Sequence, residues 1–94
     1  MKMPKLTEAE IAGGVDALDG WAIEEGMLRK TFPFEGFPDA IAFTLRLAFA
    51  AEKADHHPDI DIRWNKVTLA LTTHDSKGLT QNDFDLAKVA DTLV

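Results

Sequence analysis

Apolar residues recur along this chain at two different spacings, and the changes of spacing predict where helices and strands lie. The first segment has helical spacing. A helix is predicted to begin at Thr7, where Glu10 completes a capping box, and to end by Gly20. The apolar residues that define this helix are Ile11, Val15 and Leu18.

Two short runs rich in apolar residues follow and predict a β-hairpin. They cover residues 21–24 and 27–34, and Glu25-Gly26 separates them. Because glycine accepts a positive φ without steric cost, this dipeptide suits a hairpin turn. The two runs are therefore predicted to pair as antiparallel strands.

A long helix is predicted to start in the segment 36–39 and to run to about Asp55. Pro38 is tolerated in a first turn, and Asp39 complements the positive end of the helix dipole. Pro58 is expected to end the helix, because it disfavours helical geometry in the residue before it. The helix carries two apolar stripes, so the second is expected to meet a neighbouring helix or another subunit. The first stripe is Ile41, Leu45 and Ala48, and the second is Phe43, Leu47, Ala50 and Ala54.

The last third of the chain predicts a second hairpin and a final helix. Apolar and polar residues alternate on both sides of a turn placed at Asn65-Lys66. The alternating apolar residues are Ile60, Ile62, Trp64, Val67, Leu69 and Leu71. The final helix should open at Thr80, where Asp83 completes a second capping box and Leu79 can pack onto Phe84.

The order of these elements is α-β-β-α-β-β-α, which predicts an α+β fold. Strands with one apolar and one polar face are typical of an antiparallel sheet that helices cover on one side only. A chain of 94 residues suffices for one core, so residues 1–94 are expected to form a single domain. A domain this small gains from burial between subunits, which favours an oligomer.

Composition and charge narrow the possible functions. The chain has no cysteine, which excludes disulfides and thiolate metal sites. A formal net charge of −6 and the lack of a long basic cluster argue against nucleic-acid binding. No apolar run approaches the roughly 18 residues that span a membrane, and no apolar leader opens the chain. The cytoplasm is therefore the expected compartment, without membrane contact.

The three histidines of the chain are the first candidates for chemistry. His56 and His57 lie at the exit of the long helix, and His74 lies just past the end of a strand. Glu52 precedes His56 by one helical turn, close enough to orient its imidazole or support the protonated form. The alternative for each group is structural: a polar helix terminus, a solvated loop or, for Asp83, helix capping alone.

A metal-dependent hydrolase is a second interpretation of the same histidines. Three histidines and one carboxylate would satisfy the ligand count of zinc or iron. Adjacent histidines diverge on most backbones, however, and no His-x-His spacing places two imidazoles on one face. A nucleophilic triad is not favoured either, because the only serine, Ser76, lacks a Gly-x-Ser-x-Gly motif. Neither a metal nor a cofactor is therefore expected.

The second half of the chain also carries a series of short motifs. They are Glu52-Lys53-Ala54-Asp55-His56-His57-Pro58, Trp64-Asn65-Lys66-Val67, Thr73-His74, Gly78-Leu79-Thr80 and Asp83, preceded by the looser matches Gly20-Trp21 and Arg29–Phe32. Over roughly residues 5 to 94, this series resembles the pterin-4a-carbinolamine dehydratase family. The combined spacing is specific, whereas His-His-Pro alone would be a weak signal.

The resemblance implies a four-stranded antiparallel sheet with three helices on one face, and an enzyme that dehydrates a 4a-hydroxy-tetrahydropterin. By similarity, the catalytic residues are His56, His57 and His74. Asp83 matches an acidic residue associated with the site, while Glu52 and Asp55 match residues that flank it. Backbone groups near Thr72 and Thr73 are expected to bind the pterin. Some relatives carry tryptophan where this chain has Ile60, so aromatic stacking of the pterin is not implied there.

The dehydration would give a quinonoid dihydropterin and support tetrahydropterin recycling. One proton must reach the departing hydroxyl and another must leave a ring nitrogen. Imidazole suits both tasks, because its unperturbed pKa of about 6.5 makes both protonation states available near neutral pH. We expect His57 and His74 to exchange the protons and His56 to bind or position the substrate.

The expected partners are a small-molecule pterin and further copies of the chain, as a homodimer or homotetramer. An interaction protein without catalytic activity is the alternative from another functional class. By the same resemblance, animal relatives also act as dimerisation partners of a homeodomain transcription factor. The long helix with two apolar stripes could serve such a role equally well.

Overall fold

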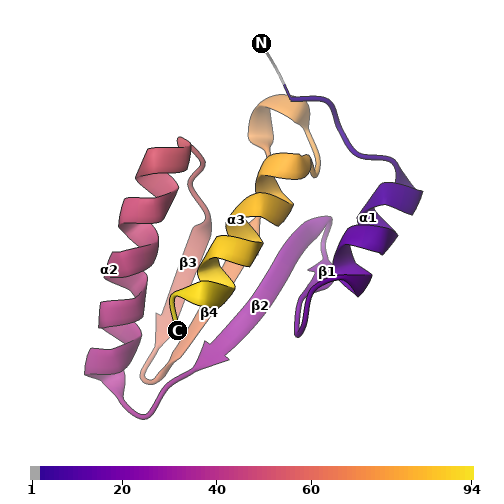
Figure 1. The fold of residues 1–94 in the computed structure, drawn as a ribbon. Helices are drawn as coiled ribbons and strands as arrows, with labels where there is room; N and C mark the ends of the chain where they lie inside the picture. Colours follow the sequence, from indigo (N-terminus) through magenta and orange to yellow (C-terminus); the bar gives the residue numbers. More distant parts are fainter. Residues whose placement is uncertain (1–2) are drawn as a thin grey trace.

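A computed structural model describes residues 3–94, which form a sheet with helices on one side (Figure 1). The helices are α1 (Glu8–Asp16), α2 (Phe37–Ala54) and α3 (Gln81–Thr92). The strands are β1 (Ala22–Glu24), β2 (Met27–Pro33), β3 (Asp59–Arg63) and β4 (Lys66–Leu71), and a 3₁₀ turn, η1 (His74–Ser76), precedes α3. The predicted order α-β-β-α-β-β-α and the α+β fold are confirmed. Among these residues, no helix combines the length and apolar character required to cross a membrane.

The four strands form one antiparallel sheet in the order β1-β2-β4-β3. Both predicted hairpins are present, and they join through the pairing of β2 with β4. This central pairing places Leu28 opposite Leu71 and Phe32 opposite Val67. Because directly opposed residues point to the same face, the centre of the sheet offers the helices a largely apolar surface, interrupted by Lys30 opposite Leu69.

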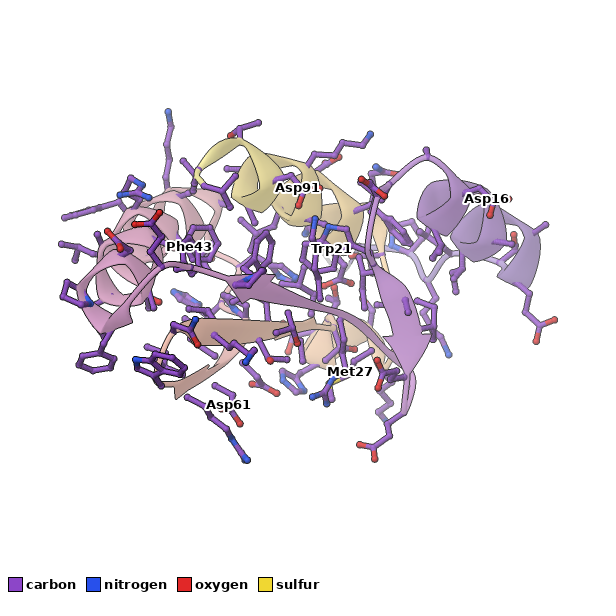
Figure 2. The ribbon with its side chains drawn as sticks, turned by 90° about the horizontal axis from the view of Figure 1, so that it is seen from below. Asp16, Trp21, Met27, Phe43, Asp61 and Asp91 are labelled. Atoms are coloured by element: carbon purple, nitrogen blue, oxygen red, sulfur yellow. The ribbon has the colours of Figure 1, made fainter. Side chains whose placement is uncertain are left out.

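The helices bury the apolar face of the sheet and leave its polar face open. Figure 2 shows Trp21 and Phe43 on the side of the helices and Asp61 on the opposite side. Phe43 of α2 packs on Phe32 of β2 with ring centroids 4.8 Å apart. Further buried residues of this core include Leu28, Leu47, Val67, Leu69, Leu71, Leu86, Ala87, Ala90 and the predicted pair Leu79 and Phe84.

Both predicted capping boxes are present. The Thr7 N–H donates to the Glu10 carboxylate at 2.8 Å, and the Glu10 N–H donates to the Thr7 hydroxyl at 3.1 Å. At the start of α3, the Thr80 N–H donates to the Asp83 carboxylate at 2.9 Å. These bonds use backbone N–H groups that have no partner inside a helix, so each helix start is set by residues close in sequence.

The other end of α3 is held to the first hairpin by Asp91. Its carboxylate accepts hydrogen bonds from Trp21 Nε1 at 3.1 Å and from Lys30 Nζ at 2.9 Å. Figure 2 shows Asp91 on α3 directly above Trp21. Because Lys30 lies on β2, this contact fixes α3 against the centre of the sheet.

The second hairpin turns one residue earlier than predicted. Arg63 pairs with Lys66, so the turn consists of Trp64 and Asn65 and not of Asn65 and Lys66. Trp64 has a φ of 52° and is 69% exposed, so it does not extend the apolar face of β3. Two-residue hairpin turns favour positive φ because it matches the twist of the strands. Ile60 on the edge strand β3 is also largely uncovered.

The two apolar stripes of α2 differ in burial. In the second stripe, Phe43 and Leu47 are fully buried, and Ala50 and Ala54 line a hollow shared with α3. The predicted contact of this stripe with a neighbouring helix is therefore confirmed. The first stripe remains uncovered and extends in both directions. Its large apolar side chains, here called the exposed stripe, are Phe37, Ile41, Leu45 and Phe49.

Helix α2 ends at a residue with left-handed backbone geometry, which comes before Pro58 in the chain. Asp55 directly follows the helix and has a φ of 51°. Its N–H donates to the Glu52 carbonyl at 3.1 Å. The next N–H, of His56, donates to the Ala51 carbonyl at 3.0 Å. These two bonds form a Schellman motif, which satisfies the last carbonyls of the helix and turns the chain away from its axis.

Replacing Asp55 with glycine is expected to keep or raise the free energy of unfolding, by up to about 1 kcal/mol, because glycine accepts positive φ without a Cβ clash. Asp55→Val is expected to lower it by about 1–2 kcal/mol, because a β-branched side chain is strained at this φ. Urea denaturation of both variants tests the prediction. Equal stability of the two variants would contradict it.

Candidate active site

The segments that follow α2 and β4 lie at the same end of the molecule (Figure 1), and a hollow of about 230 Å³ opens between them. Its lining residues are Asp55, His56, His57, Thr72, Thr73, His74 and Asp75. All three histidines therefore line one hollow. Two other site residues predicted from the sequence, Glu52 and Asp83, do not line the hollow, but each forms a hydrogen bond with one of its histidines.

His56 is the buried member of the histidine cluster. The Schellman motif turns it inward, and it is 9% exposed. Its Nε2 lies 2.6 Å from Oδ1 of Asp83, a fully buried residue in the first turn of α3. Buried polar groups need hydrogen-bond partners, and here each side chain supplies the partner of the other. The contact joins the end of α2 to the start of α3.

The side chain of Asp83 has three hydrogen-bond partners. Oδ2 accepts from the Thr80 N–H at 2.9 Å and from the Thr73 hydroxyl at 2.9 Å, while Oδ1 faces His56. The hydroxyls of Thr73 and Thr80 lie 2.8 Å apart. Helix capping was the structural alternative for Asp83, and the structure shows that Asp83 does cap α3. The same carboxylate caps the helix with one oxygen and holds His56 with the other.

Glu52 pairs with His57, whereas the sequence predicted that it would orient His56. Glu52 Oε1 lies 2.8 Å from His57 Nε2, and both side chains are largely exposed. The prediction assumed that helical spacing continues to residue 56. The helix ends before that, and the left-handed Asp55 turns His56 inward, which brings His57 to Glu52. Exposed pairs of this kind contribute little to stability.

The third histidine comes from the segment after β4. His74 opens η1, just past the end of β4, as the sequence predicted. Its side chain is exposed and has no hydrogen-bond partner within residues 3–94. The nearby Thr73 N–H donates to the Gly78 carbonyl at 3.1 Å. This amide already has a partner, and the binding of the pterin by backbone groups near Thr72 and Thr73 stays a prediction.

Two residues of the cluster were missed by the sequence analysis. Asp75 lines the hollow, and its position next to His74 was the available signal. Thr80 was interpreted as a helix cap only, because its contact with Thr73 depends on tertiary packing. In the part of the chain that the structure describes, no three or more histidine, aspartate or glutamate side chains are arranged to hold a metal ion.

A larger hollow lies at the opposite end of the molecule. Its volume is about 570 Å³, and its lining includes Phe34, Asp39, Arg46 and Val94. It contains no histidine and no hydrogen-bonded pair of titratable side chains. The smaller hollow is therefore the better candidate on chemical grounds, although it has less volume.

Comparison with known proteins gives concordant results for sequence and structure. A Roseiflexus sp. (strain RS-1) protein, provisionally named a pterin-4-alpha-carbinolamine dehydratase, is 56% identical over 90 residues, which cover 96% of this chain and 97% of that protein. The crystal structure of a transcriptional coactivator/pterin dehydratase from Brucella melitensis has a TM-score of 0.91 at 34% identity and covers 95% of this chain and 97% of its own. A pterin dehydratase-like protein, described as a RuBisCO assembly factor in the alpha-carboxysome, has a TM-score of 0.65 at 26% identity, with 78% and 84% covered.

The family profile described as Pterin 4 alpha carbinolamine dehydratase matches residues 4–93. The match covers both histidine segments and all the elements of the fold. The resemblance first suggested by the motifs is therefore confirmed, and this chain belongs to the pterin-4a-carbinolamine dehydratase family.

Proposed function

We propose that this chain removes water from a 4a-hydroxy-tetrahydropterin and releases a quinonoid dihydropterin, in support of tetrahydropterin recycling. The observation that carries the proposal is a single hollow lined by His56, His57 and His74. Imidazole is the side chain that most readily both donates and accepts protons near neutral pH. Membership of the family supports the pterin as substrate class.

The reaction needs an acid and a base but no change of oxidation state. The C4a–O bond breaks with its electron pair moving to oxygen, and the departing hydroxyl takes up one proton to leave as water. The adjacent ring nitrogen loses its proton, and the electron pair of that N–H bond forms the new C=N bond. Each positioned acid or base of this kind accelerates a reaction by about 10²–10⁴-fold.

We assign the proton exchange to His57 and His74 and the positioning of the substrate to His56. His57 and His74 are exposed at the hollow, so both can exchange protons with water between turnovers. His56 is buried, and its Nε2 is already bonded to Asp83. Asp55, Thr72 and Thr73 complete the wall that would contact the pterin ring.

The size of the hollow limits how much of the substrate it encloses. At about 230 Å³ it is smaller than the roughly 300–1,000 Å³ of pockets that enclose a drug-sized ligand. We therefore assign it to the bicyclic ring, with the side chain of the pterin projecting into solvent. The enzyme is then expected to accept pterins with different side chains.

A direct assay tests the proposed reaction. The hydroxy-pterin is generated in situ, and its dehydration is followed with and without the purified protein. The protein is expected to raise the rate in proportion to its concentration, and to do so equally after treatment with a chelator. A folded protein that leaves the rate at its uncatalysed value would refute the proposal. Loss of activity with the chelator would support the metal-dependent alternative.

We also infer that the exposed stripe of α2 binds the same stripe of a second copy. Its residues recur at every fourth position, with a phenylalanine at each end and aliphatic residues between them. In an antiparallel approach, Phe37 would meet Phe49 and Ile41 would meet Leu45. Such a self-complementary surface suits a twofold interface and the predicted homodimer or homotetramer.

Replacing Leu45 with lysine is expected to weaken this self-association, because it places an unpaired charge in an apolar interface. Light scattering should give the wild type a mass that is a multiple of 10.4 kDa, and should shift Leu45→Lys toward 10.4 kDa. Thr31→Lys, on the open face of the sheet, is the control and should keep the wild-type mass. A monomeric wild type would contradict the inference and favour a different partner for the stripe.

A further inference from the structure

We propose that Thr73 is a positioning residue that acts through Asp83 to fix His56 in one tautomer, with Nδ1 as the nitrogen that meets the substrate. The role toward the substrate rests on the proposed dehydratase function, whereas the tautomer does not. The proposal starts from a connected set of hydrogen bonds at the base of the hollow.

The direction of each bond follows from the protons that each group carries. Two donors, the Thr80 N–H and the Thr73 hydroxyl, converge on Oδ2 of Asp83, which is the pattern of a carboxylate that only accepts. The Thr73 hydroxyl therefore gives its one proton to Oδ2, at 2.9 Å. The Thr80 hydroxyl, 2.8 Å from that of Thr73, must then be the donor in the bond between them.

The set is held by two segments that are separate in the fold. Thr80 and Asp83 belong to the start of α3 and are fully buried. The Thr80 hydroxyl oxygen also accepts from the Asn82 N–H at 3.3 Å, which ties it to the helix. Thr73 comes from the segment after β4. Its hydroxyl is therefore the contact that fixes the carboxylate relative to the sheet as well as to the helix.

This arrangement leaves Oδ1 of Asp83 for His56 alone. An oxygen that only accepts, 2.6 Å from Nε2, requires the proton of the neutral ring to be on Nε2. The lone pair is then on Nδ1, which has no protein partner among the residues that the structure describes. Because His56 lines the hollow, this lone pair suits an N–H group of the pterin ring.

The tautomer can be measured without any assay of activity. In a neutral imidazole, the ¹⁵N chemical shifts of the two nitrogens differ strongly according to which one carries the proton. The wild type labelled in histidine is expected to show the Nε2–H tautomer at His56. Asp83→Asn is expected to show the Nδ1–H tautomer, because the asparagine NH₂ can donate to Nε2. A wild type with the proton on Nδ1 would overturn the assignment.

Two substitutions of Thr73 test its part in the arrangement. Thr73→Val removes the hydroxyl at nearly constant shape, so the carboxylate loses one restraint and both His56 tautomers should become populated. The kcat for dehydration should fall roughly tenfold, because small displacements in a site have effects of this order or larger. Thr73→Ser keeps the hydroxyl and should restore the single tautomer and kcat to within about twofold of the wild type.

Thr31→Val is the matched control, because it removes a threonine hydroxyl from a similar 2.8 Å pair, with Thr68, on the open face of the sheet. It should change neither the tautomer nor kcat. Thr73→Val with the wild-type tautomer and kcat would overturn the role of Thr73. If Thr73→Val does not fold, Asp83→Asn decides whether the carboxylate sets the tautomer, and Thr73→Ser compared with Thr73→Ala decides the role of the hydroxyl. The expected tautomers in a protein without dehydratase activity would refute the proposed function and leave the tautomer assignment intact.

Discussion

Replacing His57 with alanine is expected to lower the rate of pterin dehydration by about 10²–10⁴-fold, the range that one positioned acid or base contributes. His57 lines the hollow and is oriented by the carboxylate of Glu52 at 2.8 Å. The free energy of unfolding should change by no more than about 0.5 kcal/mol, because the side chain is 61% exposed. The dehydration assay and urea denaturation measure the two effects separately.

Lys53→Ala is the control for His57→Ala. Lys53 lies in the last turn of α2 and is exposed, yet it does not line the hollow. Its replacement should leave the dehydration rate unchanged. If His57→Ala kept the full rate, proton transfer would have to be assigned to His74 and His56 alone, and the role given to His57 would be wrong.

The largest loss of stability is expected from Asp83→Ala, at about 3–5 kcal/mol. The carboxylate is fully buried and accepts from His56, Thr73 and Thr80. Its removal leaves these donors without a buried partner and deletes the cap of α3. A loss of this size is a large part of the roughly 5–15 kcal/mol by which small domains are stable. The midpoint of urea denaturation should fall accordingly.

Asp75→Ala separates this effect from the mere loss of an acidic residue at the hollow. Asp75 also lines the hollow, but its side chain is exposed and outside the hydrogen-bonded set of Asp83. Its replacement should change the free energy of unfolding by no more than about 0.5 kcal/mol. A small effect of Asp83→Ala, similar to that of Asp75→Ala, would mean that the buried set of hydrogen bonds contributes little to the fold.

The sequence by itself determined the elements of the fold and the identity of the candidate residues. The capping boxes at Thr7 and Thr80 set helix starts, and Glu25-Gly26 set the first turn with positive φ at both positions. These signals are readable because the groups that make each bond lie within a few residues of one another. The alternation of apolar residues likewise determined which face of β4 is buried, since neighbouring side chains point to opposite faces.

Only the tertiary structure decided which side chains meet. His56 and Asp83 are 27 residues apart, and their contact exists because α2 ends and α3 begins at the same end of the sheet. The left-handed turn at Asp55 breaks the helical spacing on which the prediction relied, so Glu52 forms its hydrogen bond with His57 and not with His56. The choice of the buried stripe of α2 also depended on where the sheet lies. Hydrogen bonds between distant segments are set by packing, which local spacing does not encode.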